Sequence, residues 1–341
     1  MMRLDMPLFV LDAAGTVKYA VGGRFTENSE DALPVRAIAP ACPITALGDP
    51  SFCAVHGLRY PCYAGSMAHG IASVELVTAM GESGMLGFFG SAGLPINKLR
   101  GKIKRRHNRM LSKPFGVNLI NSPHDTAWER EAVELLLQEG IRLIEASAYI
   151  RPTMPLVKYR VTGLRQDSQG KILTPNRIIA KVSRSEIAKR FLEPPPANVL
   201  KKLVEAGEIT KEEAHLAKFI PLAHDITAEA DSGGHTDHRT ATALLPTLQK
   251  VRDEIQSEHD FAESPRIGLA GGIGTPHAAA AAFAMGAAYI VTGSINQACA
   301  EAGTSPLVRK MLAQATQTDV TDAPAADMFE MGVKVDRKSD V

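Results

Sequence analysis

From Tyr60 onward, short apolar runs alternate with segments in which apolar residues recur at helical spacing. This alternation is typical of parallel strands joined by crossover helices. One such helix is predicted over Asp125 to Glu139, because Asp125 can cap its first turn and Gly140 can end it. Eight runs are candidate strands: Tyr60 to Ala64, Met85 to Phe89, Phe115 to Ile120, Arg142 to Ala146, Arg177 to Val182, Asp225 to Glu229, Arg266 to Ala270 and Ala288 to Thr292. Eight parallel strands close a barrel, so the pattern predicts an α/β fold of the (β/α)8 TIM barrel class.

Two segments interrupt this alternation. Tyr159 to Thr174 is predicted to form a hairpin around Asp167–Gly170, which has the composition of a turn. Ala197 to Phe219 has the pattern of two amphipathic helices and follows three consecutive prolines. We therefore expect a helical insertion between strands five and six, at about residues 185–222, and we expect it to form a lid over the mouth of the barrel.

Residues 1–59 differ from the rest of the chain. Leu8–Leu11 and Val17–Val21 flank a turn and predict a small hairpin. A proline-rich connector is expected to follow, through Pro34, Pro40 and Pro43. We therefore expect an N-terminal β appendage with its connector over residues 1–59 and the barrel over residues 60–341.

The composition excludes several classes of protein. The chain has 341 residues, 45% of them hydrophobic and 22% charged, which is ordinary for a globular protein and excludes disordered and collagen-like chains. The formal charge is +1, so no global field would hold nucleic acid or an anionic membrane. Ile267 to Ala300 contains no charged residue, but its glycines divide it into pieces shorter than a membrane span. A buried β-α-β unit fits that segment better.

The cysteines and the N-terminus indicate a cytoplasmic protein. Cys42, Cys53, Cys62 and Cys299 form no C-x-x-C pair, so we expect reduced thiols. The apolar stretch from Met6 to Val10 is too short and too close to acidic residues for a signal peptide.

Two glycine-bearing turns follow the seventh and eighth predicted strands. Ala270, Gly271 and Gly272 come first, and Thr275 can then cap the next helix. Thr292–Ser294 ends the eighth strand in the same way. Because neighbouring parallel strands end at one edge, the turns should converge where barrels commonly bind a phosphate. Tight turns without a ligand are the alternative.

The segment Asp231–Arg239 follows the sixth strand. Its glycines can place His235 at the barrel mouth, where Asp231 or Asp237 could orient the ring. His235 is therefore the candidate catalytic acid. The alternatives are a histidine that only anchors the loop and, more weakly, a zinc site with His238, which lacks a third nitrogen ligand.

Two polar side chains stand in otherwise apolar strands. Asn118 needs hydrogen-bond partners, which either the edge of a heteroaromatic ring or the backbone of the core could supply. Lys181 is a nearly buried cation that requires an anion or an electron-rich ring. The chain has neither a P-loop motif nor a strand-linked dinucleotide fingerprint, so a nucleotide would bind as in barrels.

The stretch Lys98–Arg109 is the one dense basic run. It could dock an acidic carrier protein or a phosphorylated tether, although a solvated helix face is the usual role of such a run.

The motifs together resemble a known family. Gly65–Ala68, Gly116–Asn118, Ser232–His235, Ala270–Ile273 and Thr292–Ser294 occur in the order seen in flavin-dependent barrels of the nitronate monooxygenase and enoyl reductase superfamily. More narrowly, Tyr60–Leu94 and Ala323–Gly332 resemble the PfaD type, the separate enoyl reductase of polyunsaturated fatty acid synthases and trans-acyltransferase polyketide systems.

The resemblance implies FMN as cofactor, with its phosphate near the two glycine turns, its ring near Gly65, Met67, Asn118 and Lys181, and His235 over the ring. The implied cofactor-binding residues are Gly65, Ser66, Met67, Asn118, Lys181, Ser232, Gly233, Gly234, Ala270, Gly271, Gly272, Thr292, Gly293 and Ser294. No metal is implied.

The resemblance also implies a reaction. NADPH, or NADH, would reduce the flavin, which would pass hydride to the β-carbon of a trans-2-enoyl thioester while His235 protonates the α-carbon. The implied partners are an acyl carrier protein, other synthase subunits and a second copy of the chain in a homodimer. PfaD-type chains continue beyond the position of Val341, so this chain either is cut there or lacks a lid over the substrate site.

Two other functions are compatible with the residues. A nitronate monooxygenase would use the same flavin, with His235 as a base and oxygen as the oxidant. A barrel without flavin, acting as a scaffold or a phosphosugar lyase, belongs to another class.

Overall fold

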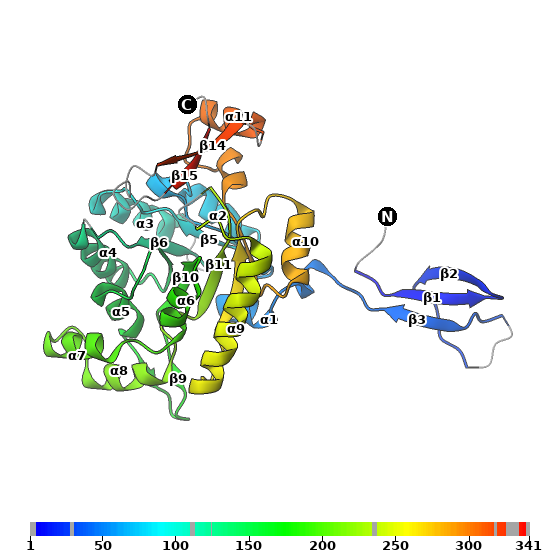
Figure 1. Cartoon of the computed structure of the whole chain (residues 1–341), viewed down its shortest axis with the longest axis horizontal. Coiled ribbons are helices and arrows are strands. Elements are labelled where there is room, and N and C mark those ends of the chain that lie inside the picture. The colour runs from blue at the N-terminus through cyan, green and yellow to red at the C-terminus, as the bar shows by residue number, and fades with distance from the viewer. Residues whose placement is uncertain are drawn as a thin grey trace.

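The structure is a computed structural model that describes residues 5–27, 31–109, 113–123, 125–233, 237–316, 319–324 and 334–338. Its centre is a closed parallel barrel with the strand order β10-β11-β12-β13-β4-β5-β6-β7 (Figure 1). The strands are β4 (Cys62–Ala64), β5 (Leu86–Phe89), β6 (Gly116–Ile120), β7 (Leu143–Ser147), β10 (Arg177–Val182), β11 (Asp225–Glu229), β12 (Arg266–Ala270) and β13 (Ile290–Thr292). All eight predicted strands, and the barrel class, are thereby confirmed.

Helices surround the barrel on its outside (Figure 1). They are α2 (Val74–Glu82), α3 (Ile96–Arg109), α4 (Thr126–Gln138), α5 (Met154–Val161), α6 (Ser185–Leu192), α9 (Ala241–His259) and α10 (Pro276–Ala284). Helix α4 shows why they begin and end where they do. The Asp125 carboxylate accepts a hydrogen bond from the backbone N–H of Trp128 at 3.0 Å, and Gly140 has a φ of 68° just after the helix.

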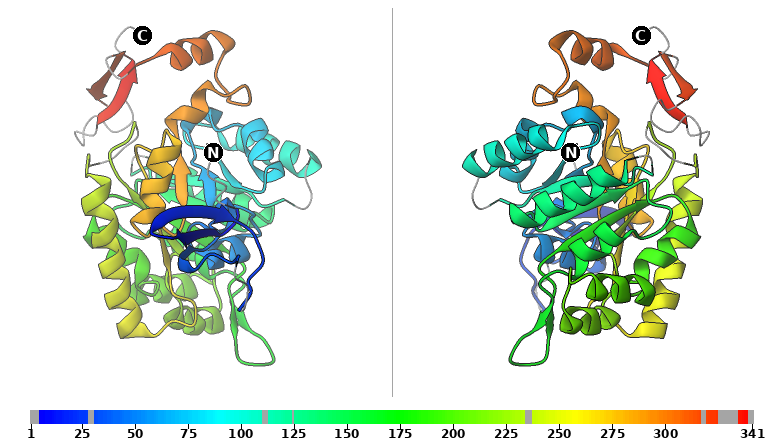
Figure 2. Two further views of the ribbon diagram at one scale, coloured as in Figure 1. Left: turned by 90° about the vertical axis from the view of Figure 1, so that its right-hand side faces the viewer. Right: turned by 90° about the vertical axis from the view of Figure 1, so that its left-hand side faces the viewer.

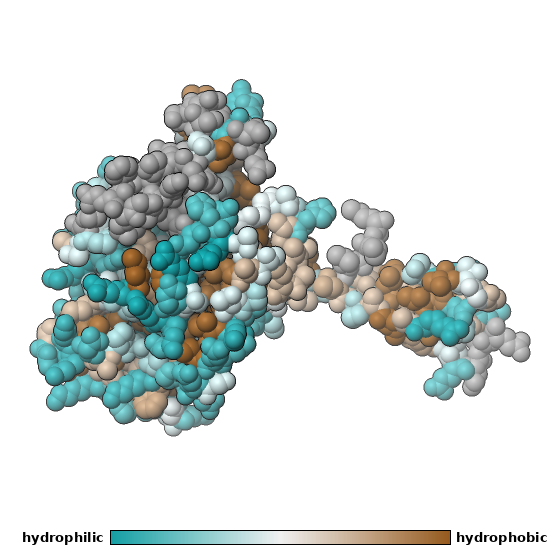
Figure 3. Space-filling model, in the orientation of Figure 1, coloured by the Kyte–Doolittle hydropathy of each residue, from teal (hydrophilic) through white to brown (hydrophobic). Residues whose placement is uncertain are grey.

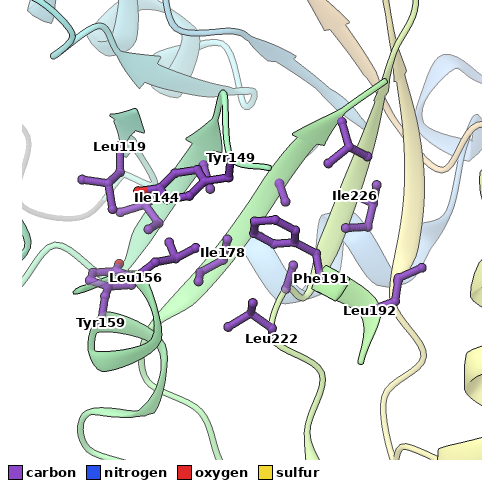
Figure 4. Close-up of a cluster of buried hydrophobic side chains, with 14 of the residues drawn as sticks. Leu119, Ile144, Tyr149, Leu156, Tyr159, Ile178, Phe191, Leu192, Leu222 and Ile226 are labelled. Carbon is purple, nitrogen blue, oxygen red and sulfur yellow. The ribbon is translucent and has the colours of Figure 1, made fainter. Parts of the chain in front are cut away.

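The hydrophobic core has two layers, as expected for a barrel that is apolar on both sides of its strands. The outer layer lies between the strands and the helices. Figure 4 shows part of it, where Ile144 and Ile178 of the barrel meet Leu156, Phe191 and Leu192 of the neighbouring helices. A second cluster fills the lumen and includes Phe52, Tyr63, Leu86, Phe88, Leu143, Ile179 and Tyr289.

Helix α1 (Pro50–His56) closes the lumen at the end where the strands begin. The Phe52 ring stacks on Tyr289 with 4.1 Å between ring centroids, and His56 Nε2 lies 2.8 Å from a carboxylate oxygen of Asp225. Arg266 donates to the other oxygen of Asp225. Burial by itself would raise the pKa of Asp225, but the charge of Arg266 and the contact with His56 hold it below its usual value. These contacts fix α1 across the end of the lumen where the strands begin, and a ligand site is expected at the other end.

The helical insertion does not lie over the mouth, so that expectation is wrong. Helices α7 (Ala197–Glu205) and α8 (Lys211–Leu216) lie at the opposite end, beside α5 and the hairpin of β8 (Arg165–Gln166) and β9 (Ile172–Leu173) (Figure 1). The Glu213 carboxylate accepts the backbone N–H of Gly163 at 2.6 Å, and Lys158 lies 3.2 Å from Glu208. The reason is the path of the chain. Helix α6 runs back along the barrel after β10, so the prolines that start the insertion follow at the end where strands begin.

The predicted hairpin is confirmed only in its central part. Strands β8 (Arg165–Gln166) and β9 (Ile172–Leu173) pair antiparallel, and the Asp167 carboxylate accepts the N–H of Lys171 in the turn. Tyr159, expected at the start of the hairpin, instead lies in α5. The Tyr159 side chain is fully buried. Burial of one face of a helix, rather than pairing in a strand, therefore determined the local structure here.

The N-terminal hairpin is confirmed, with β1 (Leu8–Ala13) paired to β2 (Thr16–Val21). The connector expected after it contains a third strand, β3 (Val35–Ala39), which pairs with the other side of β1. Its flanking prolines lie just outside the strand, where a missing N–H does not interrupt the pairing. The sheet stands away from the barrel and presents apolar side chains at its surface (Figures 1 and 3).

The C-terminal elements lie at the end of the barrel where the strands finish (Figures 1 and 2). They are the short helix η4 (Ser294–Ala298), helix α11 (Pro306–Gln314) and the paired strands β14 (Val320–Pro324) and β15 (Lys334–Lys338). Most of the Ala323–Gly332 motif lies outside the described residues. Among the residues described, no helix is both long and apolar enough to cross a membrane.

Candidate active site

Polar side chains from neighbouring strands enter the open end of the lumen. A Cβ on Gly116 would meet the ring of Phe88, which lies in the lumen cluster, so alternate residues of β6 point inward and include Asn118. Asn118 pairs in register with Glu145, and Glu145 with Ile179, which lies two residues before Lys181. Asn118, Glu145, Lys181 and Glu229 thus come from the adjacent strands β6, β7, β10 and β11. We call these four residues the polar arc.

Lys181 has an anionic partner within the protein. Its Nζ lies 2.7 Å from a carboxylate oxygen of Glu229, and both side chains are largely buried. Burial alone would lower the pKa of Lys181, but the charges of Glu229 and Glu145 raise it above its usual value. The lysine is therefore a fixed cation. Of the two partners expected for it, an anion or an electron-rich ring, the structure shows the anion, which is Glu229 and was not among the candidate residues.

Asn118 fixes the neighbouring strand. Its side-chain N–H group donates to the Glu145 carbonyl oxygen at 3.1 Å and to the Ser147 hydroxyl at 3.0 Å. The donor half of this amide therefore anchors the core, which is one of the two roles considered for it.

Glu145 is fully buried and was also missed by the sequence analysis. One carboxylate oxygen accepts the backbone N–H of Ser66 at 3.0 Å and also the Ser66 hydroxyl. Ser66, expected to contact the cofactor, therefore directs its hydroxyl to a carboxylate of the barrel. The sequence contains a signal that could have identified Glu145, because it is the one acidic residue in the strand Leu143–Ser147. Side chains alternate between the two faces of a strand, which directs this acid toward the lumen.

Below the polar arc, three hydroxyl groups form a floor across the lumen. The Thr227 hydroxyl lies 2.8 Å from that of Tyr63 and 3.0 Å from that of Tyr289. Burial raises the pKa of both tyrosines well above the usual value, so both stay neutral. Tyr63 and Tyr289 belong to the packed lumen cluster, so this floor is where the apolar lumen ends and the polar arc begins.

Glycine corners lie on the side of the mouth opposite the polar arc. Strands β12, β13 and β4 are neighbours, and the backbone N–H of Gly65 donates to the Thr292 carbonyl oxygen at 2.9 Å. The corners after these strands are Gly271–Gly272, Gly293 and Gly65, and we call them the glycine arc. The predicted convergence of the two glycine turns is confirmed, and a third corner joins them.

The corners differ in what surrounds them. Gly271 has a φ of 95°, and a Cβ there would lie 2.7 Å from the Ala230 backbone, so this glycine is needed for packing. Gly272 has a φ of 69° but faces open space, since no atom lies within 4 Å of an added Cβ, and Gly293 is equally open. Open backbone at two neighbouring corners fits the approach of a phosphate.

The corner after β4 packs against the segment that follows β5. A Cβ on Gly90 would overlap the Met67 carbonyl oxygen, so only glycine lets the segment after β5 pass so close. This contact fixes Gly65–Met67 at the rim. The predicted contact of Met67 with a ring stays a prediction.

The loop after β11 carries the candidate acid. His235 and Gly234 lie outside the described residues, whereas Ser232 and Gly233 lie within them, beside the mouth. The two aspartates expected to orient His235 have other partners: Asp231 lies 2.7 Å from His238 Nδ1, and Asp237 accepts from Arg184 Nε at 2.8 Å.

Asp237 clamps the loop to the end of β10. Besides Arg184, the Ser183 hydroxyl donates to it, and the Arg184 hydrogen bond in particular lowers the pKa of Asp237 to about 2. The carboxylate is therefore charged at any pH at which the protein would function. The clamp holds Asp237, two residues after His235 in the sequence, at the end of β10 on the polar arc side of the barrel.

A family model for nitronate monooxygenase matches residues 50–325, which is most of the chain. The chain belongs to the nitronate monooxygenase family. Enzymes of this family are oxidoreductases that depend on a flavin. The open glycine arc and the buried polar arc fit a flavin, because the first suits its phosphate and the second offers hydrogen-bonding groups to a polar ring.

Within this family, the chain is similar to parts of large synthases. It is 43% identical over 337 residues to a polyunsaturated fatty acid synthase protein of Thraustochytrium sp., covering 98% of this chain but 22% of that protein. It is also 43% identical over 291 residues to the polyketide biosynthesis protein PksE of Bacillus subtilis, covering 85% of this chain and 38% of that protein. The chain therefore spans well under half the length of these two relatives.

A solved structure supports the same placement. The enoyl reductase domain of MlnA, from the macrolactin cluster of Bacillus amyloliquefaciens, is 43% identical and superposes with a TM-score of 0.84. The match covers 87% of this chain and 67% of that domain. FabK from Thermotoga maritima, at 20% identity and a TM-score of 0.57, shares the fold.

Proposed function

We propose that this member of the nitronate monooxygenase family is an FMN-dependent enoyl reductase, which reduces the 2,3-double bond of a trans-2-enoyl thioester with NADPH or NADH. The observation that carries the proposal is the pairing of an open glycine arc with a buried polar arc around one barrel mouth, in a chain 43% identical to the MlnA enoyl reductase domain.

The chain's own residues would hold the cofactor from two sides. Gly271–Gly272 and Gly293–Ser294 would hold the phosphate, while Gly65, Met67 and Asn118 would contact the ring. When bound, FMN supplies a hydride carrier between the nicotinamide and the β-carbon of the substrate. The floor of Tyr63, Thr227 and Tyr289 would keep water from entering below the ring.

His235 would donate the proton that the α-carbon of the substrate gains. A histidine suits this task because its ordinary pKa lies near neutrality. Asp237, two residues further along the chain, is bound to Arg184 and would anchor this end of the loop. Lys181 would stabilise negative charge near the ring. Its ion pair with Glu229 would weaken this stabilisation, because the carboxylate offsets part of the positive charge.

The second candidate is a nitronate monooxygenase, which the family match itself favours. Stopped-flow mixing separates the two. The protein is reduced with NADPH, then mixed with anaerobic crotonyl thioester or with aerated buffer, and flavin absorbance is followed. We expect rapid reoxidation by the thioester. Reoxidation by oxygen alone would contradict the reductase, and a colourless protein that takes up no FMN would indicate a flavin-free barrel.

A carrier protein is the partner we propose, with other synthase subunits. The predicted basic run forms α3, whose buried face holds Leu99 and Ile103, while Lys98 and Lys102 are exposed. Arg105 pairs with Glu75, so part of the run is neutralised within the chain. The exposed lysines suit the acidic surface of an acyl carrier protein.

Charge reversal on α3 tests this partner. Lys98→Glu with Lys102→Glu should raise KM for carrier-bound enoyl substrate at least ~10-fold at low salt, because steering by opposite charges is lost. The rate with a free crotonyl thioester should not change. Lys201→Glu with Lys202→Glu on α7, at the other end of the barrel, is the matched control. Equal losses in both double variants would contradict the docking site.

A further inference from the structure

The strongest unexplained feature of the mouth is the second oxygen of Glu145. The side chain is fully buried, and no donor among the described residues meets hydrogen-bond geometry at Oε1, although the Tyr63 hydroxyl lies close enough to interact with the carboxylate. The other oxygen accepts the N–H and hydroxyl of Ser66. Ser66 supplies both donors to one oxygen, so Glu145 is a buried carboxylate whose other oxygen keeps its capacity to accept a hydrogen bond.

The surroundings of Glu145 do not balance its charge. The charge of Glu145 acts on Lys181, but the hydrogen-bonded partner of that lysine is Glu229 at 2.7 Å. One lysine faces two glutamates, which leaves one negative charge in excess in the buried polar arc. The field of Glu145 reaches these groups, because it contributes to raising the pKa of both Lys181 and Tyr63. A buried charge without full compensation is costly, and groups of this kind cluster at functional sites.

The position of Glu145 links this charge to the cofactor corner. A Cβ on Gly65 would lie 3.8 Å from Oε1, in van der Waals contact, so the carboxylate lies directly against the corner after β4. Gly65 is one of the residues expected at the flavin ring. A flavin gains electrons when it is reduced, so a fixed anion beside the ring raises the energy of the reduced form more than that of the oxidised form.

We propose that Glu145 is a positioning residue with two tasks: it holds the Gly65–Met67 corner through Ser66, and its charge keeps the reduction potential of the bound flavin low. The inference rests on the proposed function. A low potential makes the reduced cofactor a stronger hydride donor to an enoyl thioester. Glu145 touches neither substrate nor reacting atoms in this role, and it acts through the corner and through its field.

Glu145→Gln tests the inference, because the amide oxygen can still accept from Ser66 while the charge is lost. We expect the ratio of reduced to oxidised flavin affinity to rise at least tenfold, which is an upward shift of about 30 mV for a two-electron couple. The shift is measured by spectroelectrochemical titration. The flavin-free Gln variant should also melt at a higher temperature than the wild type, because an uncompensated buried charge is gone.

Two further variants separate charge from structure. Glu129→Gln is the matched control, since Glu129 is a buried acid of α4 that bonds Tyr149 and Thr153 on the outer side of the barrel. Its potential should equal that of the wild type. Ser66→Ala removes a hydroxyl but keeps the carboxylate, and it should weaken FMN binding without an upward shift.

The outcomes are distinct. A Gln variant that binds FMN with an unchanged potential overturns the inference, and so does an equal shift in Glu129→Gln. If Glu145→Gln does not fold, Glu145→Asp is measured instead. An unchanged potential there supports the role of the charge, and an upward shift of about 30 mV overturns it. A wild-type chain that binds no FMN overturns the proposed function itself, and this inference with it.

Discussion

Gly272→Asp removes the flavin from the protein, with a loss of FMN affinity of roughly 100-fold or more. The expected cause is repulsion, because a carboxylate at this corner would face the cofactor phosphate, and opposed like charges cost several kcal/mol. The fold should survive, since an added side chain at Gly272 points into open space. FMN binding is measured by the quenching of flavin fluorescence during titration of the flavin-free protein.

The matched control is Gly272→Asn, which has nearly the same shape but no charge. Asn tolerates the positive φ of 69° better than most residues, so this variant should keep most of its FMN affinity. Gly271→Ala is a contrasting case, because its Cβ would lie 2.7 Å from the Ala230 backbone and disturb the corner itself. If the Asp and Asn variants bind FMN equally well, the phosphate does not lie at this corner.

His235→Ala should keep FMN but slow reoxidation by an enoyl thioester by roughly 10²- to 10⁴-fold, the usual contribution of a general acid. Reduction of the flavin by NADPH should continue at its normal rate, because that step needs no proton from the histidine. Stopped-flow measurement gives the rate of flavin reduction by NADPH and the rate of reoxidation by the thioester separately.

The control for the loop is His238→Ala. His238 lies in the same loop and pairs with Asp231 at 2.7 Å, so its loss tests whether any disturbance of the segment slows the reaction. We expect this variant to stay within about tenfold of the wild type, well short of a lost general acid. Normal reoxidation of His235→Ala would remove His235 from the chemistry, and equal slowing in both variants would assign it a structural role.

The barrel itself could be predicted from the sequence, because each strand is a short apolar run bounded by turn residues. The Arg177–Val182 run, for example, matches β10 residue for residue. The meeting of the corners at Gly271–Gly272 and Gly293 followed from topology alone, since neighbouring parallel strands end at one edge.

Other features depended on contacts that a pattern does not show. Glu145 and Ser66 belong to β7 and to the corner after β4, which are not neighbouring strands, so their hydrogen bond depends on the closure of the barrel. The pairing of Lys181 with Glu229 depends in the same way on the register of β10 and β11. The position of α7 and α8 was wrong because composition does not tell on which end of a barrel an insertion lies.

The separation of the mouth into a glycine arc and a polar arc has a consequence for how such a barrel can diverge. Under the proposed function, the phosphate would be held on β12 and β13, whereas Lys181 and Glu229, which would act on the electronic state of the ring, stand on β10 and β11. Substitutions confined to β6, β10 and β11 could therefore change the reactivity of such a barrel without first losing the prosthetic group. For directed evolution, Asn118, Lys181 and Glu229 are the positions to vary, while Glu145, which also holds the Gly65–Met67 corner, and the glycine corners are left untouched.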